Sequence, residues 1–418
     1  MERGDVMRKS LVALSALQLL ASPALAAEPP KYEPQFDALW QMVDDHFYDP
    51  SFHGLDWKAI GARYRGRLVG VTNDAGFERL ATAMLGELGT SHLYVFPPTD
   101  SSAAGTGIAV RWRTIAGQPI AAAIDPLSEA SAAGLRVGDL LLSPLTAVSG
   151  PKGSIATLRV ENCGHATHTL HVRRVSALWP PVHPGFAWHR VSWAPDHSIG
   201  YLRIDRFDDG ADSLADQAME ELKDTDGLIV DIRHNSGGNL SALRLASYFW
   251  GPAEAAVALL ARDYLKVLDH PVTVADIANV ARVTGAYSDR TIFAAVAAHS
   301  GAAVFMSEDM GAKRYAKPVV ILIGEDTGSA AEGFGWMMRR RAKFVGARSA
   351  GALLSGEEFD LPGGWHVTIP VQGVWAADGT DYRDKALMPD IPVAWRRADV
   401  CERRDPDIAK ALAVLGVP

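Results

Sequence analysis

The most informative hydrophobic pattern is a run of five apolar residues, Val319 to Ile323, most of which are β-branched. So short a run predicts a strand that is buried on both faces, as in a parallel sheet. Gly324 and Gly328 follow and predict a sharp reversal of the chain. The apolar spacing from Ala330 to Met338 then predicts a helix, so Ser329 lies between a buried strand and the first turn of that helix.

Ser329 has two interpretations on this stretch alone. Backbone N–H groups without partners converge at the first turn of a helix, which suits a nucleophile whose reaction develops a negative oxygen. A serine at such a turn is more often only a helix cap, because caps occur at most helices. Other parts of the chain have to decide between these interpretations.

The hydrophobic pattern changes along the chain. Residues 32–96 have apolar side chains at helical spacing, and Gly89-Thr90 predicts the end of the last helix just before Ser91-His92. Residues 105–175 alternate short strand patterns with turns. Further on, a strand, a helix and a second strand predict a layered α/β fold. The expected parts are a leader at 1–26, a helical domain at 30–98, a β-rich domain at 104–175, and an α/β domain at 190–418 with a helical insertion at 250–316.

Paired glycines follow the buried strand predicted at residues 227–232. Gly237 and Gly238 would let the backbone approach a substrate closely and offer N–H groups to it. A phosphate site is the competing interpretation. It is disfavoured because neither a Gly-x-x-x-x-Gly-Lys nor a Gly-x-Gly-x-x-Gly pattern is present there.

The first 26 residues have the features of a secretory signal. A basic start precedes an apolar run from Leu11 to Leu20, and Ala24-Leu25-Ala26 predicts cleavage near Ala26. A periplasmic or secreted protein is therefore expected, although Met7 offers a second possible start. No later apolar run is long enough to span a bilayer, so we expect no membrane-spanning segment.

Charge and metal-binding residue types narrow the possible functions. The chain is 48% hydrophobic with a formal net charge of -8, which disfavours nucleic acid as a partner. His165, His168 and His171 are interpreted as strand residues, so neither a metal nor another cofactor is expected. Cys163 and Cys401 lie in parts assigned to different domains, and a disulfide between them is not the favoured expectation.

The β-rich segment resembles a PDZ domain. The resemblance rests on three stretches, GTGIAVRW, PIAAAIDPLSEASAAGLRVGDLLLS and TLRVENCGHATHTLHVRRV. A PDZ domain holds a peptide by adding it as a strand to a sheet edge, so the resemblance implies peptide binding. A β-rich spacer without a ligand is the alternative.

Several ordered blocks together resemble the S41 serine peptidases, the family of the C-terminal processing proteases and the tricorn protease core. The blocks are IGYLRIDRF, GLIVDIRHNSGGNL, VVILIGEDTGSAAE, MPDIPV and DPDIAKAL, and the likeness runs from about Phe36 to Leu412. It implies a ClpP/crotonase-like layered α/β core and a serine peptidase activity. It does not cover the 250–316 segment well.

The resemblance also implies which residues act. One branch of the family pairs its serine with a lysine, but Ala352 stands in that lysine's place. The tricorn-like branch uses a histidine in a Leu-x-Thr-Ser-His motif, which residues 88–92 match. Ser329 would be the nucleophile, His92 the base, and Ser91 a member of the relay. The oxyanion would bind the backbone N–H groups of Gly237 and Ala330.

The resemblance does not directly identify the acid that would orient His92. The family places a glutamate where this chain has Arg383. Asp384 is taken as the acid, and Asp381 is its alternative.

The expected function is that of an exported serine endopeptidase. It would hydrolyse peptides or unfolded protein tails through an acyl-enzyme on Ser329. A non-catalytic peptide-binding protein on the same fold is the alternative, motivated by the absent glutamate and by Ala331 in place of a second motif serine. The oligomeric state is left open.

Overall fold

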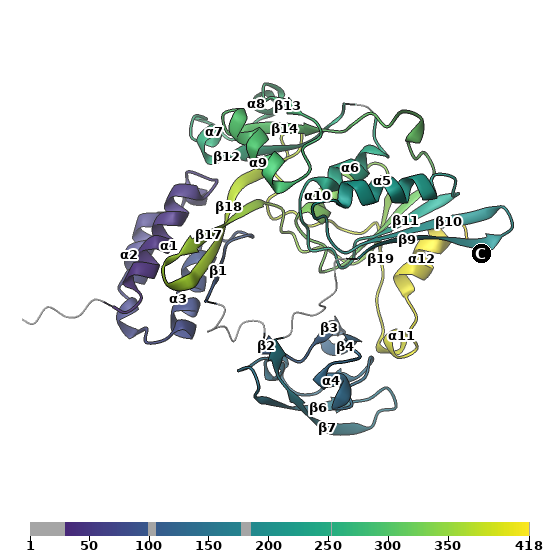
Figure 1. Ribbon diagram of the computed structural model, residues 1–418, viewed down its shortest axis with the longest axis horizontal. Coiled ribbons are helices and arrows are strands. Elements are labelled where there is room, and N and C mark those ends of the chain that lie inside the picture. Colours follow the sequence, from purple (N-terminus) through teal and green to yellow (C-terminus); the bar gives the residue numbers. More distant parts are fainter. Residues whose placement is uncertain (1–29, 99–105, 177–184, 252, 418) are drawn as a thin grey trace, which may run out of the picture.

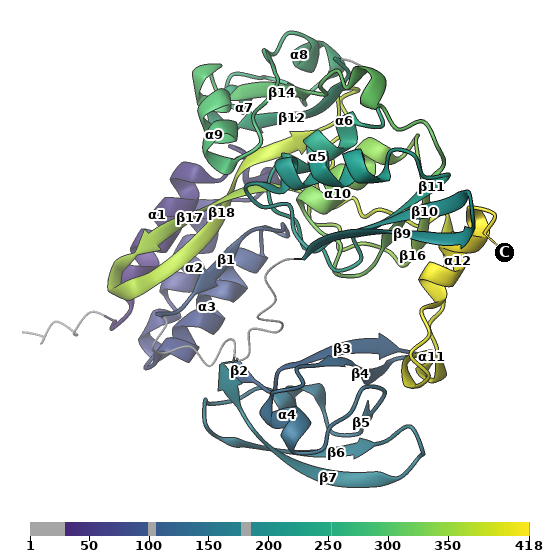
Figure 2. The ribbon, with the colours of Figure 1, turned by 45° about the vertical axis from the view of Figure 1, so that its right-hand side comes forward.

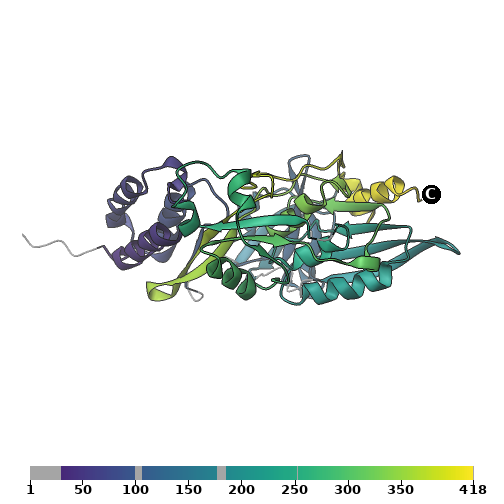
Figure 3. The same ribbon diagram turned by 90° about the horizontal axis from the view of Figure 1, so that it is seen from above.

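The computed structural model describes residues 30–98, 106–176, 185–251 and 253–417. The predicted signal peptide lies outside these ranges. Within them the chain forms a mixed α/β structure with several sheets (Figure 1). Seen from above, the N-terminal helices lie at one end of an elongated molecule and α12 lies near the other (Figure 3).

The first large sheet contains the predicted strand at residues 319–323. Its order is β19-β16-β15-β11-β10-β9, in which only β9 runs antiparallel to its neighbour. The strands are β9 (Phe186–Ala194), β10 (His197–Ile204), β11 (Gly227–Asp231), β15 (Val319–Ile323), β16 (Lys343–Gly346) and β19 (Ile391–Pro392). The prediction of buried parallel strands is confirmed, because every residue of β11 and β15 is buried.

Helices cover both faces of this sheet. Ile321 and Ile323 pack with α5, α6 and α10, whereas Val320 and Leu322 pack with α12 on the other face. Alternation along β15 therefore gives each face its own core. The helices are α5 (Ala211–Leu222), α6 (Ser241–Ser247), α10 (Ala330–Met338) and α12 (Pro406–Val414).

The second large sheet joins the N-terminal helices to the α/β part. Its main order is β1-β18-β12-β14-β13, and β17 pairs with β18. The strands are β1 (Tyr94–Phe96), β12 (Ala255–Ala261), β13 (Arg282–Val283), β14 (Ala302–Met306), β17 (Ser355–Leu361) and β18 (Trp365–Trp375). Helices α1 (Glu33–His46), α2 (Trp57–Arg65) and α3 (Asp74–Gly86) pack against it through a shared core that includes Trp365 and Val367.

The expectation of a helical insertion at 250–316 is only half right. The segment contains α7 (Arg262–Leu265), α8 (Val274–Ala278) and α9 (Asp289–Ala298). It also contributes β12 and β14, which lie inside the second sheet. Their alanine-rich sequences have high intrinsic helix propensity. Strand pairing, of β12 with β18 and β14 and of β14 with β13, together with burial on both faces overrides that preference.

The β-rich segment forms a separate sheet with its own small core. The 5-stranded sheet has the order β3-β4-β5-β6-β7, and β2 pairs with β8 beside it. The elements are β2 (Thr106–Gly107), β3 (Val110–Ile115), β4 (Gln118–Ile124), α4 (Glu129–Ala132), β5 (Leu140–Leu141), β6 (Ile155–Glu161), β7 (Thr167–Arg173) and β8 (Val175–Ser176). The prediction of short strands and turns is confirmed.

Five short 3-10 turns complete the described elements. They are Phe52–Gly54, Leu68–Gly70, Leu145–Val148, Gly311–Lys313 and Pro362–Gly364. None of the helices in the described ranges is long and apolar enough to cross a membrane.

A disulfide joins Cys163 to Cys401, contrary to the expectation from the sequence. The cysteines do lie in different parts of the chain, 238 residues apart, but α11 (Arg397–Cys401) reaches back to the β-rich sheet. Arg397 reinforces this contact by donating to the backbone oxygens of Gly138 and Asn162. Figure 2 shows α11 beside the ends of β3 and β4. The sheet is thus fastened to the C-terminal segment.

Candidate active site

Ser329 lies at the junction of β15 and α10, where the sequence predicts it. Its backbone has φ 50° and ψ −124°, a left-handed conformation that is strained for a residue with a side chain. Its hydroxyl does not cap the helix. Instead Ser329 Oγ lies 3.1 Å from His92 Nε2. The helix-cap interpretation therefore does not describe this serine.

Backbone hydrogen bonds hold Ser329 in this conformation. Its N–H donates to the oxygen of Ala352 at 2.9 Å. The loop that contains Ala352 is held in turn by Glu332, a fully buried carboxylate that accepts from the N–H groups of Gly351 and Ala352 and from the hydroxyl of Ser349. Glu332 is the last residue of the stretch Ser-Ala-Ala-Glu that begins at Ser329, and sequence reasoning missed this supporting role.

His92 follows α3 and reaches Ser329 from the N-terminal part of the chain. It also has a positive φ, 59°. Its Nδ1 lies 3.0 Å from Ser91 Oγ, so the imidazole of His92 connects Ser91 to Ser329 by hydrogen bonds. Since the Ser329 hydroxyl can donate only to an unprotonated Nε2, the consistent tautomer has its proton on Nδ1 and donates it to Ser91.

Burial keeps the His92 imidazole neutral. It lowers the pKa of His92 to about 4, because desolvation penalises the charged ring. Among the described residues, no charged group adds to this effect. At neutral pH the ring can therefore accept a proton from Ser329, but no carboxylate of the described ranges stabilises the imidazolium that results.

The predicted acid does not reach His92. Among the described residues, neither Asp384 nor Asp381 forms a hydrogen bond or ion pair with the imidazole. Both carboxylates lie beside Arg383, with Asp384 Oδ2 3.7 Å from its Nε and Asp381 Oδ2 3.4 Å from its Nη2. The Asp384 side chain is 53% exposed and its residue has φ 58°.

Arg383 instead connects the α/β part to the N-terminal helices. Its Nη1 donates to Tyr48 Oη at 3.1 Å, and Tyr48 Oη lies 3.0 Å from His53 Nε2. His53 Nδ1 then contacts the oxygen of Leu88, four residues before His92 in the chain. This chain of hydrogen bonds fixes the segment that carries His92. Sequence reasoning missed it because its members are far apart and match no motif.

The glycine loop, residues 234–239, faces Ser329. A methyl group at Gly237, where φ is 123°, would lie 2.5 Å from Ser329 Cβ and 3.2 Å from the Ala330 nitrogen. The two predicted oxyanion donors differ, however. The Gly237 N–H donates to Asn235 Oδ1 at 2.8 Å, whereas the Ala330 N–H has no acceptor among the described residues.

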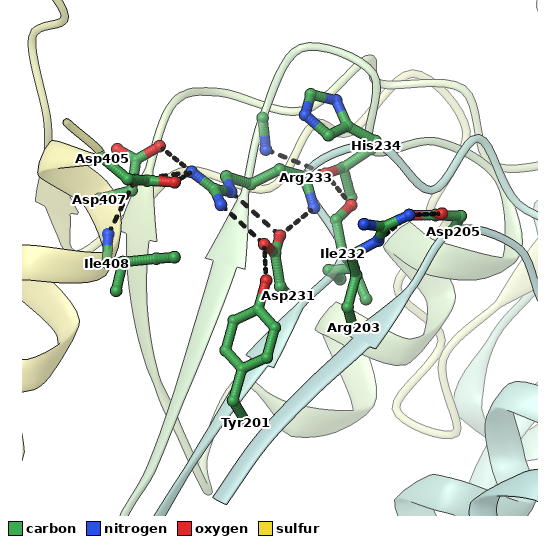
Figure 4. Close-up of polar contacts among 12 residues, drawn as sticks. Tyr201, Arg203, Asp205, Asp231, Ile232, Arg233, His234, Asp405, Asp407 and Ile408 are labelled. Carbon is green, nitrogen blue, oxygen red and sulfur yellow. Dashed lines mark hydrogen bonds and ion pairs between the residues drawn. The ribbon is translucent and has the colours of Figure 1, made fainter. Parts of the chain in front are cut away.

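A buried cluster of charges anchors the start of the glycine loop (Figure 4). Arg233 bridges Asp231, at the end of β11, and Asp405 and Asp407, at the start of α12. The hydroxyl of Tyr201 also donates to Asp231, at 2.7 Å. Burial opposes ionisation of Asp231, but its hydrogen bonds and charge contacts with Arg233 outweigh burial and lower its pKa. The cluster thus ties the loop to the C-terminal helix.

A cavity of about 330 Å³ opens beside Ser329 and His92. Its walls come from the glycine loop, α6, α9, α10, β12 and residues 353–356. A pocket of this size, next to a hydroxyl with a neutral imidazole, can hold part of a substrate for attack by Ser329.

No metal-binding cluster accompanies these groups. Across the described ranges, nowhere do three or more His, Cys, Asp and Glu side chains gather closely enough to hold an ion. His165 and His171 contact Glu161 and Thr157, respectively.

Two family models match parts of this chain. Residues 198–393 match Peptidase family S41, and residues 29–86 match the tricorn protease C1 domain. The first match contains Ser329 and the glycine loop. The chain belongs to peptidase family S41. It is therefore a serine-type peptidase, a hydrolase.

Curated relatives of this S41 peptidase come from two groups. It is 25% identical over 244 residues to the putative tricorn protease homolog 2 of Streptomyces coelicolor, a match covering 50% of this chain and 20% of that protein. It is 24% identical to the chloroplastic C-terminal processing peptidase of Tetradesmus obliquus, covering 84% of this chain and 75% of that one. The chain thus spans only a fifth of the tricorn homologue but most of the processing peptidase.

Solved structures share the fold of this S41 peptidase. The photosystem II D1 C-terminal processing protease aligns with a TM-score of 0.54 at 21% identity, covering 92% of this chain and 98% of that one. Mature CPAF complexed with lactacystin aligns with a TM-score of 0.61 at 15% identity, covering 91% and 98%. At these identities the likeness concerns the fold alone.

Proposed function

We propose that this S41 peptidase is an endopeptidase that hydrolyses peptide bonds of peptides or unfolded protein tails. Ser329 would form the acyl-enzyme and His92 would be the general base. The observation that carries the proposal is the 3.1 Å contact between Ser329 Oγ and His92 Nε2, which joins residues 237 positions apart. A contact of this length lies within the range for proton transfer.

The proposed reaction has two stages. His92 Nε2 takes the proton as Ser329 Oγ attacks the substrate carbonyl, and then gives it to the leaving amine when the C–N bond breaks. Water hydrolyses the resulting ester by the same steps. The oxyanion would accept from the Ala330 N–H, and the Gly237 N–H would join it when the substrate replaces Asn235 Oδ1 as its acceptor.

The finer assignments belong to the same proposal. The 5-stranded β-rich sheet would be a PDZ-like module that presents peptides, and the first large sheet would be a ClpP/crotonase-like core. The domains would be those expected from the sequence, except that residues 250–316 also contribute strands to the second large sheet, and residues 1–26 would direct export. Ser91 would orient His92 in place of a carboxylate, whereas Asp384 would act only if its loop moved toward the imidazole.

A non-catalytic peptide-binding protein is the second candidate. One observation favours it: among the described residues, the imidazole of His92 has no acidic partner. In serine proteases that acid fixes the tautomer and stabilises the imidazolium, so its absence weakens catalysis.

Peptide hydrolysis separates the two candidates. A library of unfolded peptides is incubated with the wild-type chain and with Ser329→Ala, and the products are identified by mass spectrometry. We expect new termini only with the wild type. Identical products from both proteins would overturn the proposed mechanism, and peptide binding without cleavage by either would favour the binding protein.

A further inference from the structure

The cavity beside Ser329 runs along one face of α10. Ala330, Gly333 and Met337 line it at helical spacing, from the first residue of the helix toward its end. Seven residues of helix span about 10 Å, which is long enough for a leucine, methionine or phenylalanine side chain. The cavity therefore begins at the proposed oxyanion donor and extends away from it.

Apolar groups dominate the inner walls. Val257 and Leu259 come from β12, Ile292 from α9 and Val374 from β18, and each is at most 7% exposed. Three of these come from the 250–316 segment, the part of the chain that the family resemblance covers least. This segment therefore builds one wall of the cavity.

The charged side chains of the lining are Arg206 and Asp289, and both are exposed. Arg206 is paired with Asp208 at 2.6 Å. A charged side chain that entered the cavity would lose its water without gaining an opposite charge from the buried lining residues. An apolar side chain would gain from the same transfer.

We propose that this cavity is the specificity pocket of the peptidase and takes an apolar side chain of leucine to phenylalanine size. That side chain belongs to the substrate residue whose carbonyl Ser329 attacks, called P1. The leaving amine must face His92 to receive its proton, so the P1 side chain lies on the other side, along α10. This inference rests on the proposed function and adds the substrate class.

Gly333 offers a direct way to narrow the pocket. It lies inside α10 and lines the cavity. Within the described part of the chain, a methyl group there would contact only Leu353 Cδ1, at an ordinary 3.7 Å. A larger residue can therefore enter the cavity without disturbing the backbone, and alanine at this position favours the helix. Gly86, an exposed glycine at the end of α3 with nothing near its missing side chain, provides the matched control.

The test compares peptides that differ only at P1. For the wild type we expect kcat/KM to be highest for peptides with Leu, Met or Phe at P1. These values should be about tenfold or more above the value for P1 Ala, and at least about a hundredfold above the values for P1 Asp or Arg. Gly333→Leu should reverse the order of Leu and Ala, Gly333→Ala should weaken the preference for Phe, and Gly86→Leu should change neither.

Labelling of Ser329 by a small fluorophosphonate separates the possible failures. The proposed P1 pocket is supported if the wild type, Gly333→Leu, Gly333→Ala and Gly86→Leu are all labelled and the P1 preferences change as described above. A wild-type preference for charged P1 residues, or a Gly333→Leu variant that is labelled normally and keeps the wild-type P1 order, overturns the pocket and leaves the proposed function standing. Absence of both labelling and cleavage in the wild type overturns the proposed function and the pocket together.

Discussion

The buried charge cluster at the start of the glycine loop allows a controlled test of what burial does to an ion pair. Arg233 contacts Asp231 through two nitrogens, and on the neighbouring strand Arg203 contacts Asp205 in the same bidentate way (Figure 4). The side chains of the first pair are 7% and 5% exposed, whereas those of the second are 45% and 17% exposed. The pairs have the same spacing along the chain. They differ in solvent access, and Arg233 also contacts Asp405 and Asp407.

The variant Arg233→Met removes the cation and leaves Asp231 and Asp407 buried. Breaking a buried ion pair by removing one partner costs about 3–5 kcal/mol of folding free energy, because the remaining charge is uncompensated. Arg203→Met breaks a pair that water already screens, for which the cost is about 0–1 kcal/mol. We therefore expect a difference of at least about 2 kcal/mol between these two methionine variants.

Urea unfolding at neutral pH measures both costs, and a second series at lower pH checks the cause. In the wild type the pKa of Asp231 is lowered, so its contribution to stability is present at neutral pH and is lost as the pH falls through that pKa. Without Arg233, burial favours the protonated acid, so the deficit of Arg233→Met should shrink at acid pH. Equal costs for the two variants, or a deficit that does not change with pH, would refute this reasoning.

Three further changes test the site and its support. Because burial lowers the pKa of His92 to about 4, kcat/KM should rise with pH around 4 and then stay level through neutrality, as followed with one peptide across the pH range. Gly237→Ala should lower kcat about 100-fold, because the added methyl group would displace Ser329. The control Gly210→Ala should keep full activity, because Gly210 also has a positive φ but none of the described atoms lies near its missing side chain. Replacing Cys163 and Cys401 by serine should lower the unfolding free energy by about 2–4 kcal/mol in denaturant titrations.

Each of these predictions has a contradicting result. If kcat/KM instead fell with decreasing pH around the ordinary histidine pKa of about 6.5, His92 would not be desolvated in the free enzyme. Equal kcat values for the two glycine variants would show that the close approach to Ser329 is unimportant. A reducing agent that destabilises the serine double variant as much as the wild type would mean that the disulfide is not the cause.

Local patterns predicted the elements that carry the nucleophile. The apolar run at 319–323 and the helical spacing after Ser329 agree with the bounds of β15 and α10. Such elements can be predicted because a doubly buried strand and a helix each leave a pattern of apolar residues within one short stretch of sequence. The pairing of Ser329 with His92 is different, since only the family motif brought these distant residues together before the structure did.

The misses have physical reasons. The alanine-rich strands β12 and β14 show no periodicity that distinguishes them from helices. β12 pairs with β18, which lies far along the chain, and β14 pairs with β12 and β13. The disulfide depends on how α11 folds back onto the β-rich sheet, which no spacing rule reveals. The proposed acid at Asp384 rested on its place beside Arg383 in the sequence, but the turn there directs Arg383 toward Tyr48.

Labelling with a fluorophosphonate tests most directly whether Ser329 is a nucleophile that His92 activates. This mechanism predicts covalent modification of Ser329 in the wild type. The modification should be retained in His270→Ala, whose histidine is exposed beside Asp269 and Asp276, and reduced at least about a hundredfold in His92→Ala. Labelling of another serine, or equal labelling of Ser329 with and without the His92 imidazole, would contradict it.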